Sequence, residues 1–213
     1  MRSNTVSVYA ITNSRTVPDA PNLRAIRVGH LTALVTNARR APAPTAANLR
    51  RYHHTIAAIA VALPAVLPVR FATVMTEPEL ALVLSARAKS LSETLKRVRG
   101  AAQMTLRLAG VPHQRDAKAA RVSGDRARSG LDYLRQRAER EREVPGFEGV
   151  RSALESWIVE ERVERKGEIV SVYHLIRRRS AAAYGRAASA AIARAGLRGV
   201  VSGPFPPYAF SAL

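Results

Sequence analysis

The chain has 213 residues and a formal net charge of +18, because 34 lysines and arginines outnumber 16 aspartates and glutamates. Hydrophobic residues make up 47% of it, enough to bury a core, which excludes a disordered basic tail. The absence of cysteine excludes a disulfide scaffold, a thiol nucleophile and thiolate metal sites.

The basic balance leaves two interpretations open. Lysine and arginine release counterions from phosphates, so the charge allows a basic nucleic-acid-binding protein. Nearly all the basic residues are arginine, however, and alanine is abundant, as codon usage in a GC-rich genome would produce. The longest apolar run, residues 56–69, contains two prolines and is shorter than the roughly 20 residues of a membrane span. We therefore expect a cytoplasmic protein without a membrane span.

Residues 1–99 predict a βββαβα domain. Residues 6–11 are rich in β-branched and aromatic side chains and predict the first strand. Two apolar runs, 23–28 and 31–36, flank a short turn with glycine and predict a hairpin. A helix follows, because apolar side chains recur at spacings of three and four residues until Pro64: Leu49, Tyr52, Ile56, Ile59 and Leu63.

Residues 66–74 predict the next strand of this domain. They are apolar on both faces except for Arg70, so we expect a central strand of the sheet. Thr76 and Glu79 then form a capping box, which predicts a helix that continues to Gly100.

The rest of the chain predicts a second α+β domain. We expect a strand over 101–108, a loop over 110–120, a charged helix over 123–144, a helix over 147–157, strands over 159–163 and 169–176, a helix from Ser180 to Gly196, and a strand over 197–202. This βαββαβ order is typical of a ferredoxin-like domain. We therefore predict an α+β chain with an N-terminal domain over 1–99 and a ferredoxin-like C-terminal domain over 100–213, which carries a proline- and aromatic-rich tail.

Catalytic motifs are missing from the sequence. There is no Walker loop, dinucleotide-binding fingerprint, His-Glu-x-x-His or Gly-x-Ser-x-Gly. His53 and His54 are adjacent, but neighbouring helical residues point about 100° apart, so a shared metal is not expected. We predict a protein that is not an enzyme and has no cofactor or metal. A small enzyme site in the second domain stays open as a weaker alternative, which a pocket with perturbed titratable groups would support.

Two segments are not explained by the fold alone. Residues 66–74 place Arg70 in an apolar strand, where a buried guanidinium is costly unless it is paired. Arg70 could lie at the sheet rim, pair with a carboxylate, or face a binding surface. The C-terminal residues 202–210 hold three prolines within four residues and three of the chain's few aromatic side chains. They could pin one domain to the other, or they could dock another protein at low entropic cost.

The two segments together resemble the gas-vesicle GvpL/GvpF family. Members of that family carry a Leu-Pro-Val-Arg-Phe-Gly-Thr strand and close with Gly-Pro-Trp-Pro-Pro-Tyr-Ser-Phe. Residues 67–73 read Leu-Pro-Val-Arg-Phe-Ala-Thr and residues 203–210 read Gly-Pro-Phe-Pro-Pro-Tyr-Ala-Phe. The sequence departs from the pattern at three positions: Ala72 stands for glycine, Phe205 for tryptophan and Ala209 for serine. Glycine is usual where backbones approach closely, so we expect packing at residue 72 to differ by a methyl group.

The resemblance implies an accessory protein of gas vesicle formation. Gas vesicles are cytoplasmic, hollow shells of a small and very hydrophobic subunit, and accessory members are thought to bind that subunit or join the growing structure. We therefore expect a chain located in the cytoplasm at the gas vesicle, whose partners are the shell subunit and other gas vesicle accessory proteins. The residues expected to bind them come from the two motifs: Arg70, Phe71, Pro204, Phe205, Pro206, Pro207, Tyr208 and Phe210.

Overall fold

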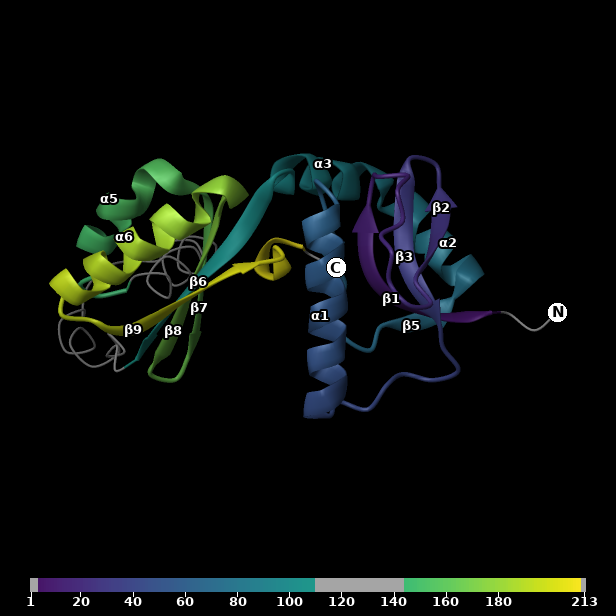
Figure 1. The fold of residues 1–213 in the computed structure, drawn as a ribbon, viewed down its shortest axis with the longest axis horizontal. Coiled ribbons are helices and arrows are strands. Elements are labelled where there is room, and N and C mark those ends of the chain that lie inside the picture. The colour runs from purple at the N-terminus through teal and green to yellow at the C-terminus, as the bar shows by residue number, and fades with distance from the viewer. Residues whose placement is uncertain (1–3, 110–143, 212–213) are drawn as a thin grey trace, which may run out of the picture. The chain divides into compact units, whose positions relative to one another are not determined.

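The computed structural model describes residues 4–109 and 144–211 (Figure 1). These residues form a mixed α/β fold with two antiparallel sheets and five α-helices. The loop predicted over 110–120 and the helix predicted over 123–144, up to residue 143, lie outside the described residues. Two compact units can be distinguished: unit 1 comprises Met1–Gln103 and Pro204–Leu213, and unit 2 comprises Met104–Gly203. The C-terminal tail, which the sequence assigns to the second domain, is thus grouped with unit 1.

The sheet of unit 1 has the strand order β2-β3-β1-β4, with β5 paired to β1. Its strands are β1 (Thr5–Thr12), β2 (Arg24–Val28), β3 (Leu31–Asn37), β4 (Leu67–Pro68) and β5 (Val74–Thr76). The predicted hairpin is confirmed, because β2 and β3 pair antiparallel around a turn in which Gly29 has a φ of +58°. β1 contains a bulge at Tyr9, where its register with β3 shifts.

Three helices cover this sheet: α1 (Ala46–Ala62), α2 (Glu77–Ala86) and α3 (Ala88–Val98). α1 and α2 lie on opposite sides of the sheet (Figure 1), which explains why five consecutive residues of β3, 31–35, are buried. The capping box of Thr76 and Glu79 is confirmed. The single helix predicted after it is wrong in one respect, because the backbone leaves helical geometry at Arg87 (φ −106°, ψ 12°) and divides it into α2 and α3.

The prediction of a continuous central strand over 66–74 is wrong. Only Leu67 and Pro68 and, further on, residues 74–76 pair with β1, and both short strands lie along the edge of β1 opposite β3. A turn over residues 70–73 separates them. The segment is apolar because β4 is buried beneath α3 and the preceding residues pack against α1, so apolarity on both sides did not require a central position.

Unit 2 has the strand order β7-β8-β6-β9. Its elements are β6 (Ala101–Ala109), α5 (Glu148–Leu154), a 3-10 turn (Glu155–Trp157), β7 (Ile158–Lys166), β8 (Ile169–Arg177), α6 (Ala181–Arg194) and β9 (Arg198–Phe205). Each strand and helix predicted over 147–202 is present, with bounds shifted by a few residues. Ser180 precedes α6 as predicted, but its side chain makes no capping hydrogen bond. The helices pack their apolar faces on the sheet, and Phe147 and Tyr184 are completely buried there.

Candidate functional site

The two sequence motifs meet on neighbouring residues of helix α1. The ring of Tyr52 lies 5.3 Å from the ring of Phe71 in an edge-on arrangement. The next residue, His53, contacts the tail, with ring centroids 6.0 Å from Phe205 and 5.8 Å from Tyr208. Because successive helical residues point about 100° apart, the two side chains serve two different segments of the chain. Helix α1 therefore brings the motif around residue 70 and the C-terminal motif together.

A tight turn presents Arg70 and Phe71. The Thr73 N–H and the Thr73 hydroxyl both donate to the Arg70 carbonyl, at 3.3 and 2.8 Å. Ala72 is the third residue of this turn and has a φ of +64°, the conformation that a type II turn requires at that position. Glycine adopts this conformation freely, whereas it costs alanine about 1–2 kcal/mol. The glycine of the family motif thus has a conformational reason rather than the close approach expected from the sequence.

Tyr52 ties this turn to α1. Its hydroxyl donates to the Val69 carbonyl, and its ring stacks on Tyr9, with centroids 4.9 Å apart. Burial raises the pKa of Tyr52, and the nearby phenols of Tyr208 and Tyr9 raise it further. The Tyr52 hydroxyl therefore stays protonated and keeps its donor role.

The tail is fixed by polar contacts of two residues in a short 3-10 turn, Tyr208–Phe210. The Tyr208 hydroxyl lies 2.9 Å from Nδ1 of His53, and the Ala209 N–H donates to Oε1 of Gln103 at 2.7 Å. Burial raises the pKa of Tyr208 to about 12, so its hydroxyl can donate to an unprotonated Nδ1. The tail is thus an ordered part of unit 1.

The eight residues expected to bind a partner differ in exposure. Arg70 and Pro204 are exposed; Phe71, Phe205 and Tyr208 are half-buried; Pro206, Pro207 and Phe210 are buried. Arg70 lies at the edge of the sheet, and its guanidinium has no partner among the residues that the structure describes. Phe210 is completely buried, which gives it a packing role in unit 1.

The residues that contact the two motifs are not among the site residues predicted from the sequence. Tyr52 was visible as a member of the apolar face of its helix, but its contacts with residues 69 and 71 depend on the turn. His53 had no signal beyond its position beside Tyr52. Gln103 is a buried amide in a strand with 4% of its surface exposed, and a polar residue among apolar neighbours was the available sign of a tertiary contact.

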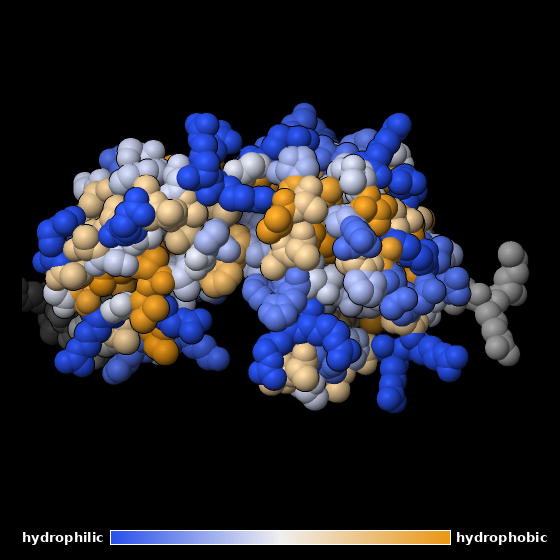
Figure 2. Space-filling view, in the orientation of Figure 1, coloured by the Kyte–Doolittle hydropathy of each residue, from blue (hydrophilic) through white to orange (hydrophobic). Residues whose placement is uncertain are grey.

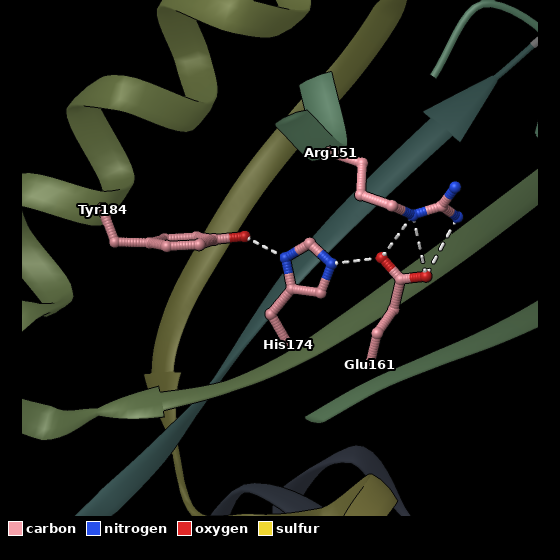
Figure 3. A network of polar contacts seen from close by, with 4 residues as sticks. All are labelled: Arg151, Glu161, His174 and Tyr184. Atoms are coloured by element: carbon pink, nitrogen blue, oxygen red, sulfur yellow. Dashed lines mark hydrogen bonds and ion pairs between the residues drawn. The ribbon is translucent and has the colours of Figure 1, made fainter. Parts of the chain in front are cut away.

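Unit 2 holds a chain of hydrogen-bonded polar side chains that runs from the partly exposed Arg151 to the buried Tyr184 (Figure 3). Nε2 of His174 lies 2.8 Å from Oε2 of Glu161, and its Nδ1 contacts the Tyr184 hydroxyl. Arg151 donates to both oxygens of Glu161, at 3.0 to 3.3 Å. An ionised carboxylate can only accept, so Nε2 of His174 carries a hydrogen and Nδ1 can accept from the Tyr184 hydroxyl. No buried side-chain nitrogen or oxygen of the described residues lacks a hydrogen-bond partner.

The electrostatics of this chain keep Glu161 ionised. Burial raises the pKa of Glu161, but hydrogen bonds from His174 and Arg151, together with their electrostatic attraction, outweigh it and lower the pKa to about 2. Burial raises the pKa of Tyr184, and the neighbouring Glu161 carboxylate raises it further. Glu161 therefore stays ionised and Tyr184 stays protonated over the whole neutral range.

A pocket of about 420 Å³ opens beside Arg151 and Glu161. Its lining consists of Glu148, Arg151, Ser152, Glu155, Ile158 and Glu161. A carboxylate with a pKa of about 2 is a poor general base at neutral pH. His174 and Tyr184 have no exposed surface, so a substrate in the pocket does not reach them. The geometry favours a structural role for the polar chain over the enzyme alternative.

The described parts of the chain contain neither a metal-binding cluster nor a helix that could span a membrane. Within residues 4–109 and 144–211, no three histidine, aspartate or glutamate side chains gather closely enough to hold a metal ion. Over the same ranges, no helix has both the length and the apolar composition to cross a membrane.

Comparisons with known proteins confirm the family resemblance that the two motifs suggested. The family model described as "Gas vesicle synthesis protein GvpL/GvpF" matches residues 6–212. The fold resembles the crystal structure of the gas vesicle protein GvpF from Anabaena sp. PCC7120, with a TM-score of 0.71, 13% identity and 99% coverage of both chains. It also resembles that of GvpF from Microcystis aeruginosa, with a TM-score of 0.73, 14% identity and coverage of 99% of this chain and 100% of that one. A search of curated proteins found no match. Because the family model spans nearly all of its length, the chain belongs to the GvpL/GvpF family of gas vesicle synthesis proteins.

Proposed function

We propose that the chain is a non-enzymatic accessory protein of gas vesicle formation that works in the cytoplasm and binds the hydrophobic shell subunit. Membership of a gas vesicle synthesis family supports a role in gas vesicle formation. The observation that carries the finer proposal is the aromatic tail held on α1. Phe205 and Tyr208 keep part of their surface exposed beside the exposed Pro204. Other gas vesicle accessory proteins are the second class of partner that this surface could fit.

The rigidity of the tail supports a binding role. Its contacts with His53 and Gln103 fix the two aromatic rings before any partner arrives. Preordered aromatic side chains lose little conformational entropy on binding, and aromatic side chains are enriched at protein interfaces. Among the eight predicted residues, we assign contact roles to Arg70, Phe71, Pro204, Phe205 and Tyr208, and positioning roles to Pro206, Pro207 and Phe210.

Co-expression with the shell subunit tests this proposal. The affinity-tagged wild-type chain should capture the shell subunit, and Phe205→Ala and Tyr208→Ala should each reduce capture strongly, because truncating an aromatic hot spot costs about 2 kcal/mol or more. Tyr208→Phe keeps the ring and should retain most of the capture. Tyr173→Ala, a half-buried tyrosine of β8 in unit 2, is the matched control and should capture as well as wild type. Absence of capture by wild type, or equal capture by all variants, would contradict the proposal.

We also propose that unit 2 is a ferredoxin-like domain. The element order β6, α5, β7, β8, α6, β9 supports it, since two strand–helix–strand segments follow one another. The strand order adds support, because the opening strands of the two segments, β6 and β8, lie side by side in the middle of the sheet.

A further inference from the structure

The basic residues of unit 1 are distributed unevenly. Between Asp19 and Glu77 the sequence has no aspartate or glutamate but carries seven arginines. Five of the seven are exposed, and their side chains form no hydrogen bond or ion pair with any residue that the structure describes: Arg39, Arg40, Arg50, Arg51 and Arg70. We call these five residues the arginine surface.

The fold gathers the arginine surface around the start of α1. The connector that carries Arg39 and Arg40 is folded onto the first turn of the helix, where the Asn48 side chain donates to the Ala43 carbonyl at 3.0 Å. The turn that carries Arg70 is held against the same helix by Tyr52. Figure 2 shows hydrophilic side chains clustered around the lower end of α1, the end at which this helix begins in Figure 1.

Some arginines outside this set have carboxylate partners. Arg24 pairs with Glu77 at 2.6 Å, and Arg151 pairs with Glu161 at 3.0 Å. The first turn of α1, in contrast, contains no acidic residue, although Arg50 and Arg51 follow shortly after it. Positive charge near a helix N-terminus is unfavourable, because the helix dipole is positive there. The described residues thus leave this positive charge without internal compensation.

We propose that the arginine surface binds an acidic segment of a partner protein. The planar guanidinium forks of the five arginines suit carboxylates, which accept two parallel hydrogen bonds from one arginine. The neighbouring Tyr52 ring is not free to stack on nucleic-acid bases, because it is buried. The inference goes beyond the binding proposed for the tail, since the arginine surface would recognise carboxylates and not apolar side chains.

Fluorescence anisotropy with a labelled glutamate-rich peptide that contains no apolar residue tests this inference. The double variant Arg50→Gln/Arg51→Gln should weaken peptide binding about tenfold, because hydrogen bonds between charged groups contribute most to such contacts. Arg186→Gln/Arg194→Gln is the matched control, since both arginines are exposed on α6 in unit 2 and the loss of net charge is the same. The control should change the affinity by less than about twofold, because distant exposed charges are screened by salt.

Three results would overturn the inference. An equal loss of affinity in both double variants would show attraction by net charge alone. A second such result is that the wild-type chain binds a labelled single-stranded RNA more tightly than the peptide, and that Arg50→Gln/Arg51→Gln loses this binding while the control keeps it. The surface would then be assigned to nucleic acid. Absence of peptide binding by the wild-type chain would show that the arginine surface does not bind acidic segments. Because the peptide lacks apolar residues, none of these outcomes depends on whether the tail captures the shell subunit.

Discussion

Glu161 is the residue on which the polar chain of unit 2 depends. It joins the guanidinium of Arg151 to the imidazole of His174. Among the residues that the structure describes, no other carboxylate pairs with either group. His174 has no exposed surface, so its Nε2 hydrogen cannot turn to water when the carboxylate is removed. A buried donor left without a partner costs more than the hydrogen bond itself contributes.

Glu161→Gln keeps one acceptor oxygen but loses the negative charge and the second acceptor, and its NH2 group cannot accept from Arg151 or His174. We therefore expect it to lower the free energy of unfolding of unit 2 by about 2 kcal/mol. Urea unfolding followed by the fluorescence of Trp157 measures this, because it is the single tryptophan of the chain and lies in unit 2 with its ring 6.4 Å from that of Tyr184. Glu164→Gln in the same strand is the control, since Glu164 is exposed and accepts only from Tyr173 among the described contacts. Equal midpoints for the two variants would contradict the structural role of Glu161.

The same carboxylate predicts a pH dependence. Its pKa in the folded chain is about 2, below the ordinary value of 4.5. A lowered pKa means that the stabilisation is complete above pH 4.5 and is lost as the pH falls from there towards 2. The difference in unfolding free energy between wild type and Glu161→Gln should therefore shrink as the pH is lowered through this window. A difference that stays constant would show that Glu161 is not held ionised by its partners.

At the scale of single elements, the segment 66–76 shows what an apolar pattern leaves undetermined. The sequence predicts a continuous strand over 66–74, but the turn at 70–73 depends on the positive φ of Ala72, and alanine gives no signal for that conformation. The helices and strands with regular spacing were predicted well, because apolar periodicity and capping residues act locally. The break at Arg87 carries no proline or glycine, so no local signal marked it.

Ala72→Gly is expected to stabilise unit 1 by up to about 1 kcal/mol, because the conformational penalty of alanine exceeds the extra entropy of glycine in the unfolded chain. Amide hydrogen exchange at Val8 reports on the turn directly, since its N–H donates to the Thr73 carbonyl at 3.0 Å. Ala58→Gly, at an exposed position of α1, is the control with the opposite sign and should destabilise by about 1 kcal/mol. Faster exchange at Val8 in Ala72→Gly would refute the turn assignment.

The pairing of β9 with β6 makes Gly199 a close contact. A Cβ atom there would lie 2.5 Å from Cδ2 of the buried Leu108 and 3.2 Å from the Arg107 carbonyl oxygen. Gly199→Ala is expected to destabilise unit 2 by about 1–3 kcal/mol, because a packed core does not absorb an added methyl group. In α5, by comparison, an added Cβ at Gly149 meets nothing within 4 Å, so Gly149→Ala should stabilise by about 0.5–1 kcal/mol. Trp157 fluorescence during urea unfolding separates the two results, and equal effects would contradict the pairing geometry.

At the scale of the whole molecule, unit 1 is built from two segments that are far apart in the sequence. Unit 2 is inserted between Gln103 and Pro204 of unit 1, so the last ten residues complete the unit that the first hundred begin. Sequence patterns indicate contacts between residues that are close along the chain. They do not indicate that the C-terminal tail packs on the N-terminal unit. The two motifs were therefore found as separate segments, and their meeting on Tyr52 and His53 required the tertiary structure.

The net charge of +18 is not spread evenly over the molecule. It includes paired arginines in both units, such as Arg24 and Arg162, and the arginine surface, whose side chains pair with no residue that the structure describes. The tail and the arginine surface are two distinct features of unit 1, one aromatic and one cationic. The partners proposed for them differ accordingly, a hydrophobic one for the tail and an acidic one for the arginine surface.

Gas vesicle formation in cells tests the central claim most directly. In a host that carries a gas vesicle gene set lacking only this gene, electron microscopy should show vesicles when wild-type chain or Tyr173→Ala is supplied. Few or no vesicles should form without the chain or with Phe205→Ala/Tyr208→Ala, provided that both variants accumulate to wild-type levels. Vesicles that form equally well without the chain would contradict its assignment as an accessory protein of gas vesicle formation.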